Sequence, residues 1–127
     1  MAANQQETIR RYLRGLEKGS AEEIIRLFSE SGVVYSPLYG RQDAGGFYKV
    51  LFKDTTRSEI TLFRIFQETE NPAVAAAHFR YEWLMKDGSE HSFECVDIFH
   101  FDEDGKIQEL RIIYDTQDTR KAFDGLR

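Results

Sequence analysis

The sequence predicts a single α+β domain in which helices come first and an antiparallel sheet follows. In the first half of the chain, apolar residues recur every three to four positions, as on one face of a helix. The second half is rich in β-branched and aromatic residues, divided by turn signals. Helices followed by a run of strands are typical of α+β domains. The 127 residues suit one domain spanning residues 1–127.

The first helix is predicted from four apolar residues spaced i, i+3, i+4 and i+7, namely Ile9, Tyr12, Leu13 and Leu16. Gly19 is expected to end it. A second helix is expected to start at Ser20, because Ser20 and Glu23 have the spacing of a capping box. This second helix is predicted to carry the apolar stripe Ile24, Leu27 and Phe28.

A short strand and a third helix are expected next. The strand covers residues 33–35 and stops before Pro37, which lacks a backbone donor for sheet pairing. The helix spans residues 43–52, and its apolar residues are Phe47, Val50 and Leu51.

Four strands are expected in the second half, over residues 59–68, 73–85, 92–101 and 107–114. Short turn sequences containing Pro or Gly separate them, and connections this short require antiparallel neighbours. For the charged tail, residues 115–127, a short helix and a frayed end are both compatible with the pattern.

Alternation along these strands predicts one apolar and one charged face. Asp97 is an exception, because it shares a face with the apolar residues Phe93, Cys95, Phe99 and Phe101. One interpretation puts Asp97 inside, where an ionised carboxylate is costly without partners. The other makes this the outer face, with Asp97 solvated, since aspartate is rarely fully buried.

The composition excludes several classes of protein. An aromatic content of 13% excludes disorder, and no apolar run approaches the roughly 18 residues of a membrane span. The formal charge of −5, with scattered Lys and Arg, argues against nucleic acid as a partner. Cys95 is the one cysteine, and no signal sequence is visible, so the expected location is the cytoplasm. No metal site or cofactor is expected, because His91 and Cys95 lie roughly 13 Å apart along one strand.

Four segments match one known pattern: Arg11-Tyr12-Leu13 through Gly19 to Phe28, the following strand up to Pro37, Gly40-Arg41 with Phe47-Tyr48, and the hairpin from Asp97 to Gln108. Together they resemble the nuclear transport factor 2-like superfamily, and within it the ketosteroid isomerases and SnoaL-type polyketide cyclases. The resemblance implies a cone-shaped fold, with three N-terminal helices packed on a curved, mostly antiparallel sheet around an apolar pocket.

The resemblance also implies roles for individual residues. Tyr12 matches the isomerases' oxyanion-hole tyrosine, Asp97 their protonated aspartate that donates a second hydrogen bond, and Tyr48 the tyrosine that supports the first. These three are the candidate catalytic residues. The isomerases' proton-shuttling aspartate is replaced by Ser36, and a hydroxyl without a partner is no base at neutral pH. In a cyclase-like site, Asp97 would instead be the ionised base and Tyr12 would orient the substrate carbonyl.

The expected function is binding of a small hydrophobic molecule whose carbonyl or hydroxyl oxygen is held by Tyr12 and Asp97. Isomerase, cyclase or dehydratase activity is left open. The residues expected to line the pocket are Ser36, Phe52, Phe79, Tyr81, Trp83, Phe99, Leu110 and Tyr114. The alternative is a non-catalytic interaction module with a pocket filled by its own side chains. The resemblance further implies a homodimer through the outer sheet face (Val96, Ile98 and Ile113). The charge and composition already described predict no nucleic-acid or membrane partner.

Overall fold

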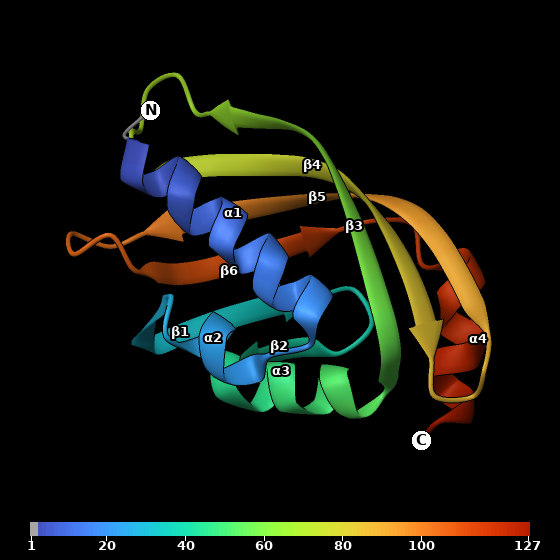
Figure 1. Ribbon diagram of the computed structural model, residues 1–127. Helices are drawn as coiled ribbons and strands as arrows, with labels where there is room; N and C mark the ends of the chain where they lie inside the picture. The colour runs from blue at the N-terminus through green and yellow to red at the C-terminus, as the bar shows by residue number, and fades with distance from the viewer. Residues whose placement is uncertain (1–2) are drawn as a thin grey trace.

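Helix α1 (Ala3–Lys18) crosses the concave face of a strongly curved sheet, and two shorter helices, α2 (Ala21–Ile25) and α3 (Ala44–Lys53), follow close to its C-terminal end (Figure 1). The computed structural model describes residues 3–127. The apolar stripe predicted for the first helix is confirmed, because all four of its residues are buried. Helix α1 therefore packs against the rest of the domain by that stripe.

The second helix is shorter than its apolar pattern predicts. Ser20 caps it as expected, its hydroxyl accepting the backbone N–H of Glu23 at 3.2 Å. The assignment of Leu27 and Phe28 to this helix is wrong, because Phe28 begins strand β1 (Phe28–Ser36). Sheet pairing buries this segment: Leu27 accepts a backbone hydrogen bond from Ile107 at 2.9 Å, and Phe28 pairs with the same residue. An apolar run of this length fits a helix or a strand equally well, and only the pairing partner decides.

The described chain forms one six-stranded sheet in the order β2-β1-β6-β5-β4-β3. The remaining strands are β2 (Gly40–Asp43), β3 (Thr55–Gln67), β4 (Val74–Met85), β5 (Glu90–Phe101) and β6 (Ile107–Ile113). Strands β3 to β6 form the antiparallel meander that the turn signals predict, although β3 begins four residues earlier than expected. Strand β1 is parallel to β6 and antiparallel to β2. The polar sequence of β2 does not predict a strand, and β2 forms through backbone pairing with β1.

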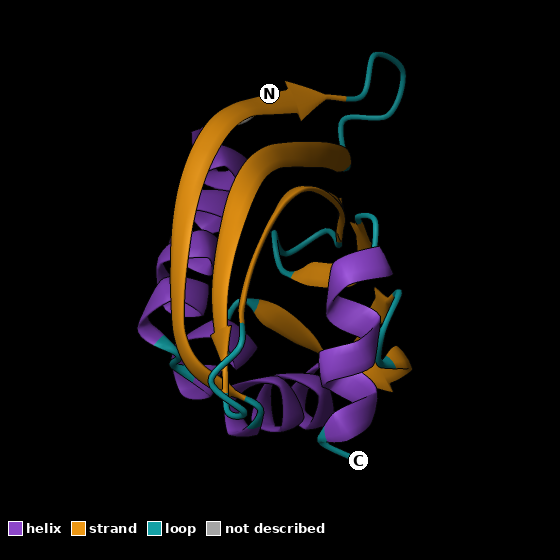
Figure 2. Ribbon diagram, turned by 90° about the vertical axis from the view of Figure 1, so that its right-hand side faces the viewer, coloured by secondary structure: helices purple, strands orange, loops and turns teal. Residues whose placement is uncertain are grey.

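The sheet bends sharply, as the arched strands β3, β4 and β5 show (Figure 2). Register shifts interrupt the pairing of β3 with β4 at two places, and that of β5 with β6 at one. Such bulges bend a strand and increase its twist. The curvature gives the sheet a deep concave face, which is the inner face of the domain.

The C-terminal tail forms helix α4 (Gln117–Gly125), which settles the choice between helix and frayed end. Helix α4 lies beside the bent ends of β4 and β5 (Figure 1) and buries Thr119 and Phe123. The ring of Phe123 packs edge-on against Tyr39 at 4.7 Å between centroids. Arg127 forms an ion pair with Asp54, and the same carboxylate accepts the Tyr39 hydroxyl at 2.7 Å. The tail is thus pinned to the end of α3.

Within residues 3–127, none of the helices has the length and apolar character needed to cross a membrane.

Candidate functional site

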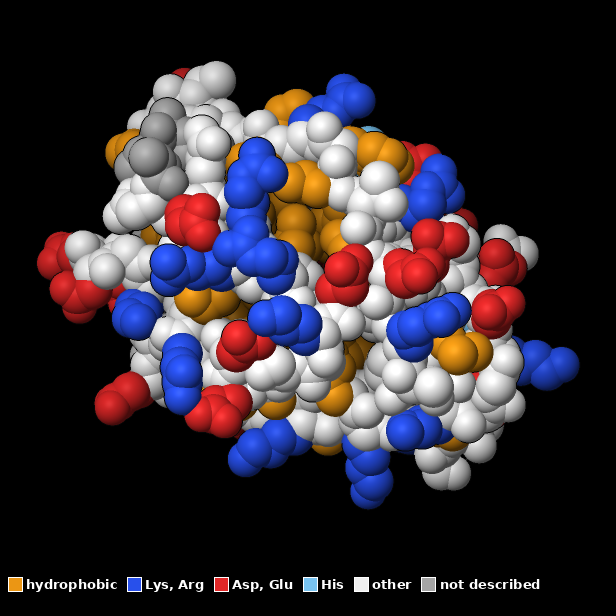
Figure 3. All heavy atoms as spheres, viewed as in Figure 1, with side chains coloured by type: hydrophobic (Ala, Val, Ile, Leu, Met, Phe, Trp, Pro, Cys, Tyr) orange, Lys and Arg blue, Asp and Glu red, His pale blue; other side chains and the backbone are white. Residues whose placement is uncertain are grey.

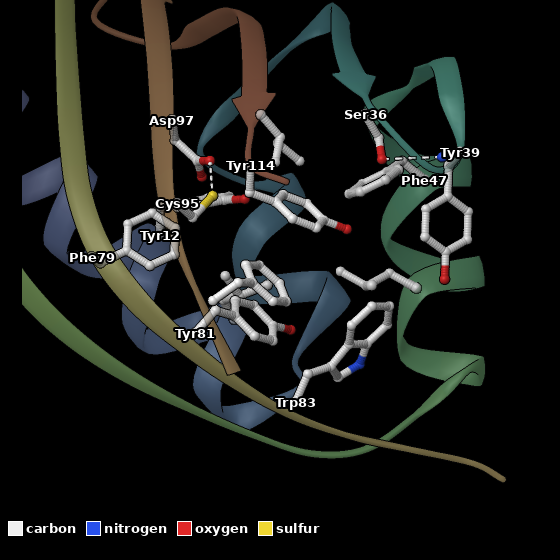
Figure 4. A pocket seen from close by; sticks show the side chains of 14 residues that line it. Tyr12, Ser36, Tyr39, Phe47, Phe79, Tyr81, Trp83, Cys95, Asp97 and Tyr114 are labelled. Atoms are coloured by element: carbon white, nitrogen blue, oxygen red, sulfur yellow. Dashed lines mark hydrogen bonds between the residues drawn. The ribbon is translucent and has the colours of Figure 1, made fainter. Parts of the chain in front are cut away.

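An apolar cavity lies between the concave face of the sheet and the helices (Figure 4). It offers about 40 Å³ to the centre of a water-sized sphere. A single water needs roughly 10–15 Å³ on that measure, so the cavity has room for a few waters or one small ring. Its lining residues are Tyr12, Leu16, Ser36, Tyr39, Phe47, Leu51, Phe79, Tyr81, Trp83, Phe93, Cys95, Asp97, Ile112 and Tyr114.

Seven of the residues singled out from the sequence line this cavity: Tyr12, Ser36, Phe79, Tyr81, Trp83, Asp97 and Tyr114. They come from α1, β1, β4, β5 and the segment after β6, so the fold brings together residues from both halves of the chain. Tyr48 does not line the cavity and lies behind Tyr12 instead.

Three of the expected pocket residues, Phe52, Phe99 and Leu110, are not in the cavity wall. Phe99 and Leu110 face inward as alternation predicts, but they pair across β5 and β6 in the solid core. Phe52 is half-buried at the end of α3 and lines a separate surface depression. Alternation identifies the face on which a residue lies, but it does not give the depth along the curved strand.

Seven further residues line the cavity and are not among the pocket residues predicted from the sequence: Leu16, Tyr39, Phe47, Leu51, Phe93, Cys95 and Ile112. Most of these residues lie on apolar faces that the sequence predicts for helices or strands, so their inward direction was predictable. The direction of Tyr39 was not, since it lies in the turn between β1 and β2.

The hydroxyl groups of Tyr12 and Tyr48 are 2.7 Å apart, and both side chains are buried. Burial raises the pKa of both phenols well above the usual value, so both carry their proton at neutral pH. Because Tyr12 borders the cavity and Tyr48 does not, the arrangement that uses both protons has Tyr48 donating to Tyr12. The proton of Tyr12 is then free to point into the cavity.

Asp97 faces the interior and is 1% exposed, which decides between the two interpretations of its strand. Within residues 3–127, its carboxyl group receives one hydrogen bond, from the thiol of Cys95 (Sγ to Oδ1, 3.1 Å; Figure 4). Burial raises the pKa of Asp97 to about 7, and the Cys95 bond opposes that rise. Protonated and ionised forms are therefore both populated near neutral pH.

Ser36 lies well apart from Asp97 in Figure 4. Its hydroxyl oxygen accepts the backbone N–H groups of Leu38 and Tyr39, each at 3.1 Å. These bonds shape the turn after β1. They also occupy the lone pairs that a proton-accepting group would need.

The aromatic wall of the cavity is ordered by stacking. The Phe93 ring stacks on the Tyr81 ring, with 5.4 Å between the centroids and 4° between the planes. It also stacks on the Tyr114 ring, with 4.0 Å between the centroids and 14° between the planes. The polar tips of two wall residues are bonded to β3: the Tyr81 hydroxyl is 2.7 Å from Ser58, and the Trp83 indole donates to Thr55 at 2.8 Å. The rings thus present mainly apolar surface to the cavity.

Other features of the described chain offer less to a small ligand. An open groove of about 190 Å³ runs between α1 and β3, with an apolar floor and arginines along one side (Figure 3). Its polar residues, Arg10, Arg14 and Glu17, are all exposed, so nothing there is desolvated as Asp97 is. Among residues 3–127, no three His, Cys, Asp or Glu side chains gather as a metal site would require.

A helix-covered, curved and unclosed sheet around a cavity of this kind defines the nuclear transport factor 2-like class of protein. The family model described as "SnoaL-like domain" matches residues 9–110. The chain belongs to the SnoaL-like family of that superfamily. A search of curated proteins finds no match.

Solved structures share the fold at low sequence identity. SalBIII, described as an epoxide hydrolase/cyclase-like enzyme in pyran ring formation in the polyether salinomycin, is 17% identical, with a TM-score of 0.73 over 90% of this chain and 92% of that one. AclR, a candidate hydroxylase from Streptomyces galilaeus, is 14% identical, with a TM-score of 0.76 over the whole of both chains. An NTF2-like protein of unknown function from Burkholderia pseudomallei is 11% identical, with a TM-score of 0.78 over 94% and 97%. These likenesses establish the fold.

Proposed function

We propose that the protein binds a small hydrophobic molecule, about one ring in size, whose carbonyl or hydroxyl oxygen is held by Asp97 and Tyr12. The observation that carries the proposal is the Asp97 carboxyl group, fully buried on the wall of a mainly apolar cavity. A buried acid with a raised pKa beside a cavity marks a functional-site candidate. Small-molecule sites are typically apolar with a few placed polar groups.

The size of the cavity limits the ligand. Pockets for drug-sized ligands measure roughly 300–1,000 Å³, whereas this cavity offers about 40 Å³. A multi-ring steroid or polyketide therefore requires the wall to move. A single six-membered ring with one oxygen matches the space and the two donors.

The protonation state of Asp97 sets the kind of oxygen that is held. Below pH 7 its neutral carboxyl group donates to a carbonyl oxygen, and above pH 7 the carboxylate has no proton to donate. Affinity for a ketone is therefore expected to fall as pH rises through about 7. Tyr12 keeps its proton throughout this range, because burial raises its pKa.

A second candidate function is acid–base catalysis on the same ligand by Asp97. A pKa of about 7 is well matched to proton transfer at neutral pH. The family includes polyketide cyclases and isomerases, and SalBIII is described as a cyclase-like enzyme. An isomerase mechanism with its base at position 36 has less support, because the hydroxyl oxygen of Ser36 already accepts two backbone N–H groups.

The alternative function is a non-catalytic interaction module, which predicts that the cavity binds no small molecule. Under either function we propose a homodimer through the outer sheet face, where Ile113 is 53% exposed. We also propose a reducing cytoplasm as the setting for the buried Cys95 thiol.

The test uses cyclohexanone and methylenecyclohexane, in which CH₂ replaces the carbonyl oxygen. Fluorescence of Trp83, the one tryptophan and a wall residue, reports binding. At pH 6, cyclohexanone should bind roughly tenfold more tightly than methylenecyclohexane, about the value of one hydrogen bond to a buried acid. Asp97→Leu should reduce this difference to what the Tyr12 hydroxyl alone supplies. Equal affinities in the wild type would refute the oxygen-holding role. No response to either compound, with no shift in thermal stability, would favour the closed module.

A further inference from the structure

The Asp97 carboxyl group and the Cys95 thiol stand two residues apart on the inner face of β5, so both point to the same side of the sheet. Both side chains are buried, and both line the cavity. The thiol is placed as a donor rather than as a nucleophile, because burial beside a carboxyl group raises its pKa and keeps it protonated.

The hydrogen bond distinguishes the two carboxyl oxygens of Asp97. Within residues 3–127, Oδ1 accepts the thiol at 3.1 Å, whereas Oδ2 has no donor among the side-chain or backbone groups. In a neutral carboxylic acid only one oxygen carries the proton, and the other is the better acceptor. A donor fixed at Oδ1 therefore favours the proton on Oδ2.

We propose that Cys95 is a positioning residue for Asp97: its thiol holds Oδ1 as the accepting oxygen and leaves the proton on Oδ2 for the cavity. This inference rests on the proposed function for its ligand, but its effect on Asp97 can be measured without one. The thiol also tunes the acid, because a donor to the carboxyl group favours the ionised form.

Other groups facing Asp97 do not compete for this role at neutral pH. They are the phenols of Tyr12 on α1, Tyr48 on α3, Tyr81 on β4 and Tyr114 after β6. Burial raises the pKa of each one, so all four remain neutral while Asp97 titrates. Cys95 is the neighbour whose replacement changes the hydrogen bond at Oδ1 itself.

Two substitutions of similar size separate positioning from packing. Cys95→Ala removes the donor and should raise the pKa of Asp97, whereas Cys95→Ser supplies a stronger donor and should lower it, each by roughly 0.5–1 pH unit. Carboxyl-detected NMR titration of Asp97 gives both values. A role in packing alone would move both variants in the same direction, and that result, or no movement in either, would overturn the inference.

A second measurement uses the wild-type protein and does not depend on the variants folding. Because Cys95 is the single cysteine, the infrared S–H stretching band reports this thiol alone. Ionisation of Asp97 makes Oδ1 a stronger acceptor, so the band should move to lower frequency as pH rises through about 7. Asp97→Leu should give a pH-independent band. A wild-type band that ignores pH would contradict the inference, whatever the outcome of the ligand titrations.

Discussion

The hydroxyl of Tyr48 lies 2.7 Å from that of Tyr12, and this bond joins α3 to α1 behind the cavity wall. The two rings also pack edge-on, with their centroids 5.9 Å apart. A buried hydroxyl without a partner costs roughly 1–3 kcal/mol, so each phenol makes the burial of the other tolerable. The pair couples the stability of the domain to the orientation of a hydroxyl group on a residue that lines the cavity.

Substituting either tyrosine should therefore show strong non-additivity. Tyr12→Phe strands the buried Tyr48 hydroxyl and should cost about 1–3 kcal/mol of unfolding free energy. Tyr48→Phe should cost less, because Tyr12 borders the cavity and its hydroxyl can still be satisfied from there. The double variant should cost less than the sum of the two, as measured by urea denaturation in a double-mutant cycle. Tyr35→Phe, at a residue that does not line the cavity, is the control, and its free energy of unfolding should add to that of either variant. Additive free energies of unfolding for Tyr12→Phe and Tyr48→Phe would contradict the coupling.

Asp97 should make the protein less stable as pH rises. Its pKa is about 7 when folded against 3.8 as the ordinary value, so the folded state holds the proton more tightly. This tighter proton binding contributes on the order of 4 kcal/mol to the free energy of unfolding. The contribution is fully present below about pH 4 and is lost as the pH rises from about 4 to 7. Asp97→Asn should flatten this part of the stability curve, measured by denaturation from pH 4.5 to 8. Asp104→Asn, on an exposed turn, should leave the slope unchanged, and the same slope in both variants would show that Asp97 is not its source.

The Asp54 carboxylate should control how firmly α4 is held. Asp54→Ala removes the partner of both Arg127 and the Tyr39 hydroxyl, and should cost about 1–3 kcal/mol. Arg127→Gln should cost less than about 1 kcal/mol, because the Arg127 side chain is 40% exposed and its charge is screened by solvent. Hydrogen exchange of the α4 amides measures the loosening. Unchanged exchange in Asp54→Ala would mean that other contacts, such as the packing of Phe123 and the Arg120 bond to the Pro37 carbonyl, anchor the helix.

Two glycine substitutions should have opposite effects. A Cβ added at Gly15 would lie 2.8 Å from the Ile24 side chain, where α1 and α2 meet, so Gly15→Ala should cost about 1–3 kcal/mol. At Gly125, a Cβ meets nothing within 4 Å and the backbone is not left-handed, so Gly125→Ala should stabilise by about 0.4–1 kcal/mol. Thermal denaturation of both variants compares them directly. A stabilising Gly15→Ala would show that the helices can separate freely.

Local patterns predict most of the fold, because most helices and strands are specified by residues close together in the sequence. The first helix follows its apolar spacing, and the meander follows its turn signals. Strand β2 escaped prediction, since its polar residues are held by backbone pairing with β1. The local pattern predicts a helix at Phe28 for the complementary reason, because its strand partner Ile107 lies 79 residues away in sequence.

For the site, the sequence by itself determined which side chains share a face, because alternation along a strand is a local property. It placed Asp97 with Cys95 and marked Tyr12 as an apolar-face tyrosine. Only the tertiary structure decided that this face of β5 is the inner one, because burial depends on where the helices pack. The bending of the sheet likewise decided that Asp97 reaches the cavity while Phe99, two residues on, fills the core. Depth inside a curved sheet arises from register shifts and helix contacts between distant segments, and no local spacing encodes it.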